Sequence, residues 1–382
     1  MKRYVNGIFP LVLAIVPAQV ILADETVVAE SLSTERQALR LIKIADEFDQ
    51  PTSMAILPGE LYLVTERGGR LQMVHDGMRQ EVGGLPEIED EEDGGLLEIV
   101  SSPAFPDTGW LYLTYASGDD ESTAAALGRA RLAGNHLVDW EPLFEQNRRS
   151  SPGEHYGARL AWLPDDTLLM SIGDRGTPGR AQDTNDHAGS LLRLDPQGLA
   201  PEDNPRFEDV GFLPELYSWG HRNIQGLAVH PDTGDAWAVE ARPNGSDELS
   251  LIHPGSNHGW PQLTLGEDAD TPGIIDEVAS SRLFTDDEIA TPAHEFSEPV
   301  APSGMALVTS EHYPDWQGDL IVGGREAKRL YRIMLDGREV VETEVLLDEE
   351  VGGISDVRQG PDGYLYVLSE TNGALYRLEP AH

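Results

Sequence analysis

The sequence of 382 residues contains no cysteine. Disulfide bonds and thiolate metal sites are therefore excluded, and no thiol is present to carry a lipid anchor. Basic residues are also scarce, with 27 Lys and Arg against 67 Asp and Glu, and the formal net charge is −40. A surface of this sign repels nucleic acid and anionic lipid, so we expect no nucleic-acid partner.

The first residues contain an apolar run, IFPLVLAIVPAQVIL (8–22), which follows two basic residues and is followed by the small Ala23. This order is typical of a secretory signal peptide cleaved before Asp24. Two prolines within the run disfavour a permanent membrane anchor. The sequence thus predicts a signal peptide over 1–23, one domain over 24–382, and a periplasmic or secreted protein without stable membrane insertion.

A tight turn followed by a strand of alternating apolar residues occurs six times. Pro-Asp with glycine or another turn former sets each turn, and period-2 apolar residues follow it. Six such units at spacings of tens of residues, without long helical periodicity between them, predict an all-β, six-bladed β-propeller. In such a fold the active site lies on loops at one end of the ring. The six units span residues 56–74, 106–117, 163–176, 230–252, 313–335 and 360–380.

Several polar loop segments carry a family resemblance that covers the chain from Leu41 to its C-terminus. Together they resemble the soluble quinoprotein sugar dehydrogenases, the glucose/sorbosone dehydrogenase family that uses pyrroloquinoline quinone (PQQ). The matching segments are GEHYGARL (153–160), GHRNIQGLAVHP (220–231), SDELSLI with PGSNHGWP (246–261), DGGLLEIV (93–100), APSGMAL (301–307) and DVRQGPDGYLYVLSE (356–370).

The resemblance implies oxidation of an aldose sugar at its anomeric carbon, with hydride transfer to PQQ beside a Ca²⁺ ion. It places His155 as the catalytic base, with Glu154 as its acidic or polar neighbour, and we assign Glu154 and Asp93 to the cofactor-binding residues. It also places Arg222 and Asn223 against the cofactor, Arg222 with a catalytic role as well. The electron acceptor is not indicated. A loop histidine bonded to its own strand, and an arginine that clamps two blades, remain the alternatives for His155 and Arg222.

The chain departs from the family pattern at several positions near the expected cofactor. Asp93 stands where the family has a glutamine, and Gly353 and Ser355 stand where it has arginines. The family's lysine has no clean counterpart, although Arg325 and Lys328 lie close, and we assign Lys328 to the cofactor. Because PQQ carries three carboxylates, these changes predict weaker PQQ binding than is usual in the family.

The resemblance places the calcium segment at EARP and the residues after it. Backbone oxygens of Arg242 and Pro243 would hold the ion, although the Arg242 side chain adds a positive charge beside it. Asp247 and Glu248, on a glycine-containing loop, are candidate side-chain ligands, since Ca²⁺ prefers oxygen donors. Ordinary solvated loop carboxylates are the alternative for both residues.

Three functions therefore remain open on the sequence alone. The first is a working PQQ-dependent sugar dehydrogenase with an altered pocket. The second is a diverged propeller that binds sugars, with weak or no PQQ binding. The third is a calcium-dependent hydrolase that uses carboxylates such as Asp93, Asp247 and Glu248. The acidic segment 263–296 is interpreted as an inserted loop between blades.

Overall fold

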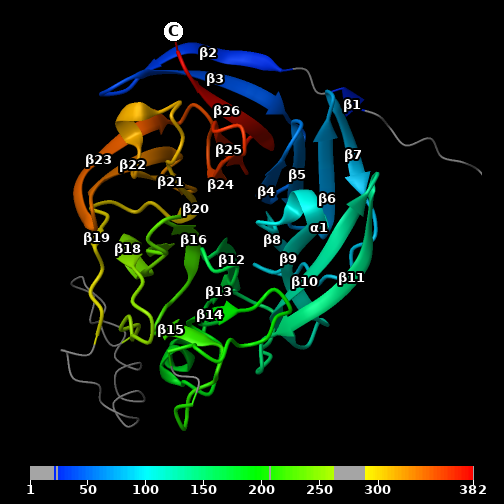
Figure 1. The fold of residues 1–382 in the computed structure, drawn as a ribbon, viewed down its shortest axis with the longest axis vertical. Coiled ribbons are helices and arrows are strands. Elements are labelled where there is room, and N and C mark those ends of the chain that lie inside the picture. The colour runs from blue at the N-terminus through cyan, green and yellow to red at the C-terminus, as the bar shows by residue number, and fades with distance from the viewer. Residues whose placement is uncertain (1–20, 23–24, 206–207, 262–288, 382) are drawn as a thin grey trace, which may run out of the picture.

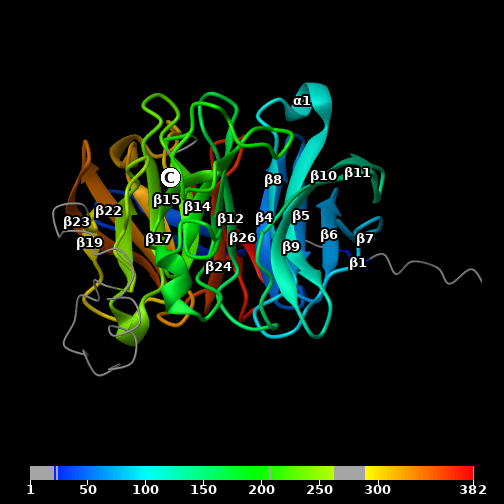
Figure 2. The ribbon, with the colours of Figure 1, turned by 90° about the horizontal axis from the view of Figure 1, so that it is seen from below.

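The computed structural model describes the chain except residues 1–20, 23–24, 206–207, 262–288 and 382. Its strands form six antiparallel sheets arranged around one axis (Figure 1). In the side view the sheets stand next to one another along a flat disc (Figure 2). The predicted all-β, six-bladed β-propeller is confirmed. The expected signal peptide lies almost entirely outside the described residues, as does most of the acidic segment 263–296.

Apart from β1, the strands of the first three sheets follow one another along the chain, and the innermost strand of each sheet comes first. The first consists of β4 (Pro51–Leu57), β5 (Leu61–Glu66), β6 (Arg70–His75), β7 (Met78–Val82) and β1 (Ile21–Leu22). The second consists of β8 (Leu96–Ser101), β9 (Trp110–Gly118), β10 (Thr123–Ala133) and β11 (His136–Glu145). The third consists of β12 (Gly157–Trp162), β13 (Leu168–Ile172), β14 (Ser190–Leu194) and β15 (Leu216–Trp219).

The remaining three sheets follow the same order. The fourth consists of β16 (Ile224–Val229), β17 (Ala236–Glu240), β18 (Glu248–Leu251) and β19 (His294–Glu295). The fifth consists of β20 (Pro302–Leu307), β21 (Leu320–Gly324), β22 (Arg329–Asp336) and β23 (Glu339–Asp348). The sixth consists of β24 (Ile354–Gln359), β25 (Leu365–Ser369), β26 (Ala374–Pro380), β3 (Ala38–Ala45) and β2 (Thr26–Ser33).

Helices are short and lie in the connections. The one α-helix of the described residues is α1 (Phe105–Thr108), and the 3₁₀ turns include η1 (Pro178–Gln182), η2 (Pro243–Gly245) and η4 (Pro314–Trp316). Within the described residues, no helix has both the length and the apolar character needed to cross a membrane.

The repeated Pro-Asp turns connect the innermost strand of a sheet to its second strand. Between β12 and β13, the backbone N–H of Asp166 donates to the carbonyl of Leu163 at 3.1 Å. The side chain of Asp165 accepts hydrogen bonds from the backbone and the hydroxyl of Thr167. Asp side chains favour such turns because they satisfy backbone groups locally. The strand that follows, β13, is buried along its whole length.

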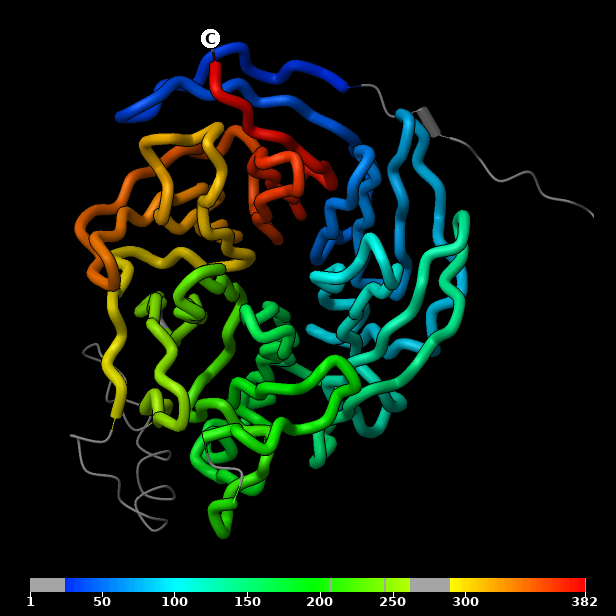
Figure 3. Tube along the Cα trace, in the orientation of Figure 1, coloured from blue at the N-terminus to red at the C-terminus, as the bar shows by residue number. Residues whose placement is uncertain are grey.

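The ring is closed by a strand from the start of the chain. β3 pairs antiparallel with β26, with Leu41 opposite Leu378, so the sixth sheet contains strands from both ends of the chain. β2 adds outside β3. The tube in Figure 3 shows the blue N-terminal strands beside the red C-terminal strand. Closure of this kind leaves no break between the first and last blades.

Six apolar clusters fill the spaces between neighbouring sheets. One of them joins the second and third sheets through buried residues such as Leu127, Leu160 and Met170. The other five clusters join the remaining neighbours around the ring. Burial of apolar surface between sheets is the main favourable contribution to this fold. The polar residues at one end of the axis are thus held by sheets that are fixed on both sides.

Candidate active site

A cavity lies at one end of the propeller axis. Its lining comes mainly from two places in the repeat, the start of the innermost strand and the loop after the second strand. These two places are adjacent because the strands pair antiparallel, as Pro51 with Glu66 and Pro302 with Gly324. The lining residues are Thr52, Arg67, Asp93, Leu97, Tyr156, Gly157, Arg159, Asn223, Gln225, Ala241, Ala301, Pro302 and Arg325.

His155 lies beside this cavity and forms a pair with Asp174. The imidazole Nδ1 is 2.7 Å from Asp174 Oδ1, and the carboxylate is buried. The pair joins the loop before β12 to the loop after β13. A carboxylate at Nδ1 fixes the ring orientation and the tautomer, which leaves Nε2 to accept a proton. The partner of His155 lies after β13 and not on β12, so this contact differs from the alternative of a loop histidine bonded to its own strand.

The loop that carries His155 has a constrained backbone. His155 has φ of 57°, in the left-handed region. A Cβ on Gly173 would overlap the carbonyl oxygen of His155, so only glycine fits at that position. Arg175 also supports the loop, because Nη1 donates to the carbonyl of Glu154 and the guanidinium covers the ring of Tyr156, 3.3 Å from its centroid. The histidine is therefore held in place by backbone packing as well as by Asp174.

Glu154 and Asp93 place two further carboxylates near His155. Glu154 Oε2 is 3.5 Å from His155 Nε2, on a side chain that is mostly exposed. Asp93 lines the cavity, and its Oδ2 is 3.4 Å from the backbone nitrogen of His155. Asp93 Oδ1 also lies 3.9 Å from Nη1 of Arg67. Both sequence-predicted acidic residues thus belong to the surroundings of the histidine.

Arg222 and Asn223 lie where the loop enters β16. The backbone nitrogen of Arg222 donates to Glu240 Oε2 at 2.8 Å, and Nη1 donates to the carbonyl of Ala241 at 2.9 Å. Burial lowers the pKa of Arg222, while the nearby Asp174 and Glu240 carboxylates oppose that shift. Asn223 lines the cavity, whereas Arg222 is half-buried next to it. The structure therefore brings both residues to the same end of the axis as His155.

Positive charge in the cavity lining comes from three arginines, Arg67, Arg159 and Arg325. Of these, only Arg325 was named from the sequence, as a neighbour of the missing lysine. Arg325 pairs with Glu370, with Nε 3.1 Å from Oε2. Lys328, which we assigned to the cofactor, is exposed and is not part of the cavity lining.

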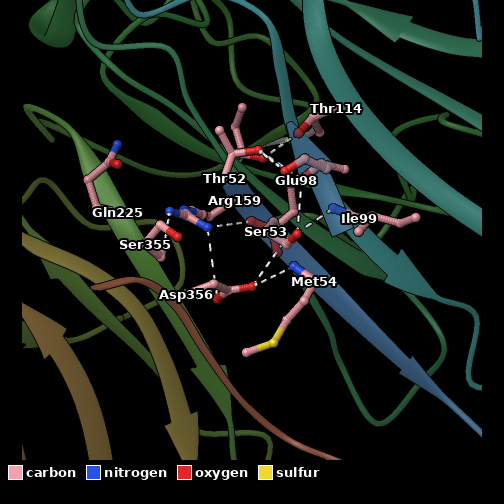
Figure 4. Close-up of polar contacts among 12 residues, drawn as sticks. Thr52, Ser53, Met54, Glu98, Ile99, Thr114, Arg159, Gln225, Ser355 and Asp356 are labelled. Carbon is pink, nitrogen blue, oxygen red and sulfur yellow. Dashed lines mark hydrogen bonds and ion pairs between the residues drawn. The ribbon is translucent and has the colours of Figure 1, made fainter. Parts of the chain in front are cut away.

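Arg159 belongs to a buried ionic network beneath the cavity (Figure 4). Its Nη1 donates to Glu98 Oε2 at 2.9 Å, and its Nη2 donates to the carbonyl of Ser355 at 3.1 Å. Arg358 contacts the same Glu98 carboxylate and also Asp356, with Nε 3.0 Å from Oδ2. Two guanidinium groups thus balance two carboxylates, and side chains from three sheets meet here.

Asp356 is the most heavily bonded member of this network. Its Oδ2 accepts hydrogen bonds from the Ser53 hydroxyl and the Met54 backbone, both at 3.0 Å. Burial raises the pKa of Asp356 to about 6, although the charge of Arg159 opposes the shift. Burial also lowers the pKa of Arg358 to about 10. With Arg159 from the third sheet, the network ties the sixth, first, second and third sheets together under the cavity.

The two positions where the family has arginines lie in tightly packed surroundings in this chain. A Cβ on Gly353 would already lie 2.7 Å from the carbonyl oxygen of Arg325. Ser355 is buried, and its carbonyl accepts the bond from Arg159. Arg67 and Arg159 instead bring cations to the cavity from the first and third sheets. Arg159 is paired with Glu98 and Arg67 lies near Asp93, so part of this positive charge is balanced by carboxylates of the chain itself.

The residues that we expected to bind calcium form ion pairs and hydrogen bonds with other protein groups. Arg242 is buried between two carboxylates, with Nη2 3.0 Å from Glu240 Oε1 and 2.7 Å from Glu248 Oε2. Asp247 accepts backbone hydrogen bonds, on Oδ1 from Arg242 and on Oδ2 from Val300 and Ala301. These carboxylates are saturated by a guanidinium and by amides.

One of the two expected backbone ligands of this segment is also engaged. The carbonyl of Pro243 accepts hydrogen bonds from the backbone and hydroxyl of Ser246, at 3.3 and 3.0 Å. In the part of the chain that the structure describes, no three His, Cys, Asp or Glu residues are grouped as metal ligands. The side chains of 240–248 therefore do not form a calcium site in this arrangement, and a hydrolase built on Asp247 and Glu248 is not supported by it.

The buried charges of this segment influence one another. Burial acts to raise the pKa of Glu240, but Arg242 and His221 outweigh it and hold the pKa of that carboxyl below its usual range. Burial raises the pKa of Glu248 to about 7, with Arg242 opposing the shift. One guanidinium cannot fully balance two buried carboxylates, so the second carboxylate retains its proton more readily.

Sequence reasoning missed Asp174, Arg67 and Arg159. For two of them the sequence contains a positional signal. Arg67 directly follows β5, just as Ala241 follows β17 and Arg325 follows β21. Asp174 lies two residues after the end of β13. Aligning the repeats on the residues that follow the second strand of each unit would therefore point to these cavity residues. Arg159 lies inside an innermost strand and has no comparable signal.

Comparison with known proteins agrees with this geometry. The family described as Glucose / Sorbosone dehydrogenase matches residues 48–377. The chain is 33% identical over 344 residues to the aldose sugar dehydrogenase YliI of Escherichia coli (strain K12), covering 88% of this chain and 92% of the relative.

Solved structures show the same similarity. A crystal structure of a glucose dehydrogenase is similar with a TM-score of 0.82 at 35% identity, covering 88% of this chain and 98% of the other. The PQQ-bound form of an aldose sugar dehydrogenase from Streptomyces coelicolor is similar with a TM-score of 0.72 at 26% identity, covering 94% of this chain and 98% of the other.

Proposed function

The chain belongs to the glucose/sorbosone dehydrogenase family, and from that premise we propose that it oxidises an aldose sugar at the anomeric carbon with PQQ as the hydride acceptor. The observation that carries the proposal is the His155–Asp174 pair beside a cavity lined by three arginines. A positioned base and a cationic pocket are the two parts that such a reaction requires of the protein.

The donor set of the cavity fits an anionic quinone. Arg67, Arg159 and Arg325 supply cations, and the neutral side chains of Thr52, Asn223 and Gln225 also line the cavity. Guanidinium groups are well suited to carboxylates because they offer paired donors in a fixed plane. We propose that these residues hold PQQ, which supplies the carbonyl carbon that takes up the hydride.

His155 performs the proton transfer in this proposal. With its proton on the Nδ1 that faces Asp174, His155 would use Nε2 to accept the proton of the anomeric hydroxyl. The buried Asp174 carboxylate then stabilises the imidazolium that forms, without taking the proton itself. With PQQ bound, the sugar would lose one proton to His155 and one hydride to the cofactor, and it would leave as a lactone. No step is assigned to calcium, because the side chains at 240–248 do not fit it.

Purified protein can be tested with a panel of aldoses, added PQQ and a dye that accepts electrons. We expect dye reduction that needs both sugar and PQQ. His155→Asn should lower kcat by about 10²-fold or more, the usual effect of a positioned base. Asparagine tolerates the left-handed backbone and keeps a donor for Asp174. The exposed His75→Asn is the matched control and should leave kcat unchanged.

The two other functions give different results in the same assay. A protein that only binds sugars would release heat with aldoses in a calorimeter but would not reduce the dye. A hydrolase would cleave its substrate without PQQ. Either outcome, with PQQ shown to be present in excess, would contradict the proposal.

We also propose that the protein works outside the cytoplasm, in the periplasm or as a secreted protein, on the basis of the signal-like residues 1–23. N-terminal sequencing of protein recovered from the periplasm or medium should begin near Asp24. An intact Met1 would contradict this proposal. The sugar-derived electrons would pass to an acceptor that the assay dye replaces.

A further inference from the structure

Trp260 connects the proposed base to two neighbouring arginines. It lies in the segment after β18, and its indole is buried. The indole Nε1 donates a hydrogen bond to Asp174 Oδ2 at 2.8 Å. Trp260 does not line the cavity. Its direct hydrogen bond to the site is the one to Asp174.

The two oxygens of Asp174 have separate partners. Oδ1 faces His155 Nδ1 at 2.7 Å and accepts the backbone N–H of Gly176 at 2.9 Å. Oδ2 accepts the indole N–H of Trp260. Bonds on both oxygens oppose rotation of the carboxylate, and they reduce the cost of burying its charge. The direction in which Oδ1 meets the imidazole thus depends on the bond at Oδ2.

The indole is itself held by its backbone. The Trp260 backbone nitrogen donates to the carbonyl of Gly220 at 2.9 Å, and Gln182 Nε2 donates to the Trp260 carbonyl at 2.6 Å. Gly220 has φ of 75°, and a Cβ there would overlap Asn257 Oδ1. The turn of Trp260 therefore packs against the loop that leads to Arg222, and this packing requires glycine.

Two guanidinium groups lie near the same ring. The Arg222 Cζ is 5.7 Å from the indole centroid, and the Arg242 Cζ is 5.5 Å from it. Both distances are within the range of cation–π attraction, which is strongest for tryptophan. The indole thus contacts the carboxylate of the proposed base pair and lies between this pair and the Arg242–Glu240 cluster.

We propose that Trp260 is a positioning residue for the base: its indole N–H orients Asp174 so that His155 keeps its proton on Nδ1 and presents Nε2 to the sugar. The inference rests on the proposed function for its effect on catalysis. Its structural part, the tautomer of His155, is independent of that function. The two parts can be tested separately.

The structural part is tested on the protein without PQQ or sugar. Protein with ¹⁵N-labelled histidine is compared as parent, Trp260→Phe and Trp237→Phe, and the His155 ring signals are identified by their loss in His155→Asn. We expect the neutral ring of His155 to carry its proton on Nδ1 in the parent and in Trp237→Phe. In Trp260→Phe we expect a mixture of both tautomers. An unchanged tautomer in Trp260→Phe would overturn the proposal.

Trp237 is a matched control because it is an equally buried tryptophan in β17, within the fourth sheet. Phenylalanine at either position removes similar volume and an indole N–H. A general loosening of the fold would therefore appear in both variants. The melting temperatures of the two variants show whether the structural cost is comparable.

The catalytic part uses a double-mutant cycle with Asp174→Asn. Trp260→Phe should lower kcat about tenfold, the rate equivalent of one lost hydrogen bond to a charged group, and should leave KM nearly unchanged. In the Asp174→Asn background it should lower kcat no further, because the partner is already altered. Additive losses, or an equal loss in Trp237→Phe, would overturn the positioning role. Absence of sugar oxidation in the parent, with the tautomer change still observed, would contradict the proposed function alone.

Discussion

Arg325 and Lys328 belong to the same loop between β21 and β22, but Arg325 lines the cavity while Lys328 is exposed to solvent. The two cations therefore differ in their access to a bound anion, although they lie close together in the sequence. This difference provides a direct test of which residue holds the quinone.

Arg325→Gln is expected to weaken PQQ binding about tenfold, because one charge-assisted hydrogen bond of about 1.5 kcal/mol or more is lost. Lys328→Gln, which removes the same charge from the same loop, should change the dissociation constant by less than about twofold, given the small effect of exposed charges. Calorimetric titration with PQQ at fixed salt measures both. Equal weakening in the two variants would show that only net charge matters and not the place of Arg325.

Asp93→Asn is expected to strengthen PQQ binding by about two- to fivefold. Its carboxylate lines the cavity and repels an anion, but it is half exposed, so the repulsion is screened to roughly 0.5–1 kcal/mol. The gain should shrink at high salt. Asp90→Asn, on the same acidic stretch but outside the cavity lining, is the control. Weaker binding in Asp93→Asn would indicate instead that Asp93 is needed to hold Arg67 or the His155 loop.

Arg242→Gln is expected to destabilise the protein by about 3–5 kcal/mol near pH 7, since it leaves Glu240 and Glu248 buried without their cation. Arg338→Gln removes an exposed arginine paired with Asp235 and should cost no more than about 1 kcal/mol. Urea unfolding compares the two. The loss of unfolding free energy in Arg242→Gln should be smaller at pH 5, where buried carboxylates with raised pKa values take up protons.

Chelation provides a companion test of the same segment. If Arg242 serves as the cation for Glu240 and Glu248, EGTA should leave the melting temperature of the parent unchanged. A fall of several degrees that added Ca²⁺ reverses would show that a metal contributes to the fold and would contradict the arrangement at 240–248.

Asp356 is expected to make the stability of the parent depend on pH in a defined direction. Its pKa of about 6 in the folded chain exceeds the ordinary value of 3.8, so the folded state binds the proton more tightly. The contribution of this group is therefore most favourable below about pH 4 and is lost as the pH rises toward 6.

Asp356→Asn removes this titration. The stability advantage of the parent over Asp356→Asn should therefore fall between about pH 4 and pH 7, by up to about 3 kcal/mol at about 1.4 kcal/mol for each pKa unit. Urea unfolding at a series of pH values measures the difference, and the exposed Asp336→Asn controls for the loss of one negative charge. An advantage that grows with pH would mean that Arg159 and Arg358 dominate over burial.

The ring could be predicted from the sequence because each unit is specified by local contacts. The Pro-Asp turn before β13 and the one before β25 are formed by contacts within a few residues, and the apolar alternation follows directly. Closure was not predicted in the same way. β3 pairs with β26 from the other end of the chain, and no local pattern specifies that partner.

The place of the candidate site was predicted where one motif contains the residue, as with His155 beside the cavity and Asn223 in its lining. It was not predicted where several blades contribute, as with Arg67 and Arg159. The expected loss of arginines at Gly353 and Ser355 was a correct observation of the sequence, but charge reaches the cavity from other sheets. Which side chains converge depends on the geometry of the whole ring. The sequence indicates this geometry only through the alignment of its repeats with one another.

The pairing of β3 with β26 has a consequence for synthesis on the ribosome. At roughly 5–20 residues per second, β3 is made on the order of half a minute before β26 exists. During that time the edge of β3 that later receives β26 has no partner from its own chain, and such an edge can pair with other chains. An early strand, and not only the last ones, can therefore pair with another chain until synthesis is complete.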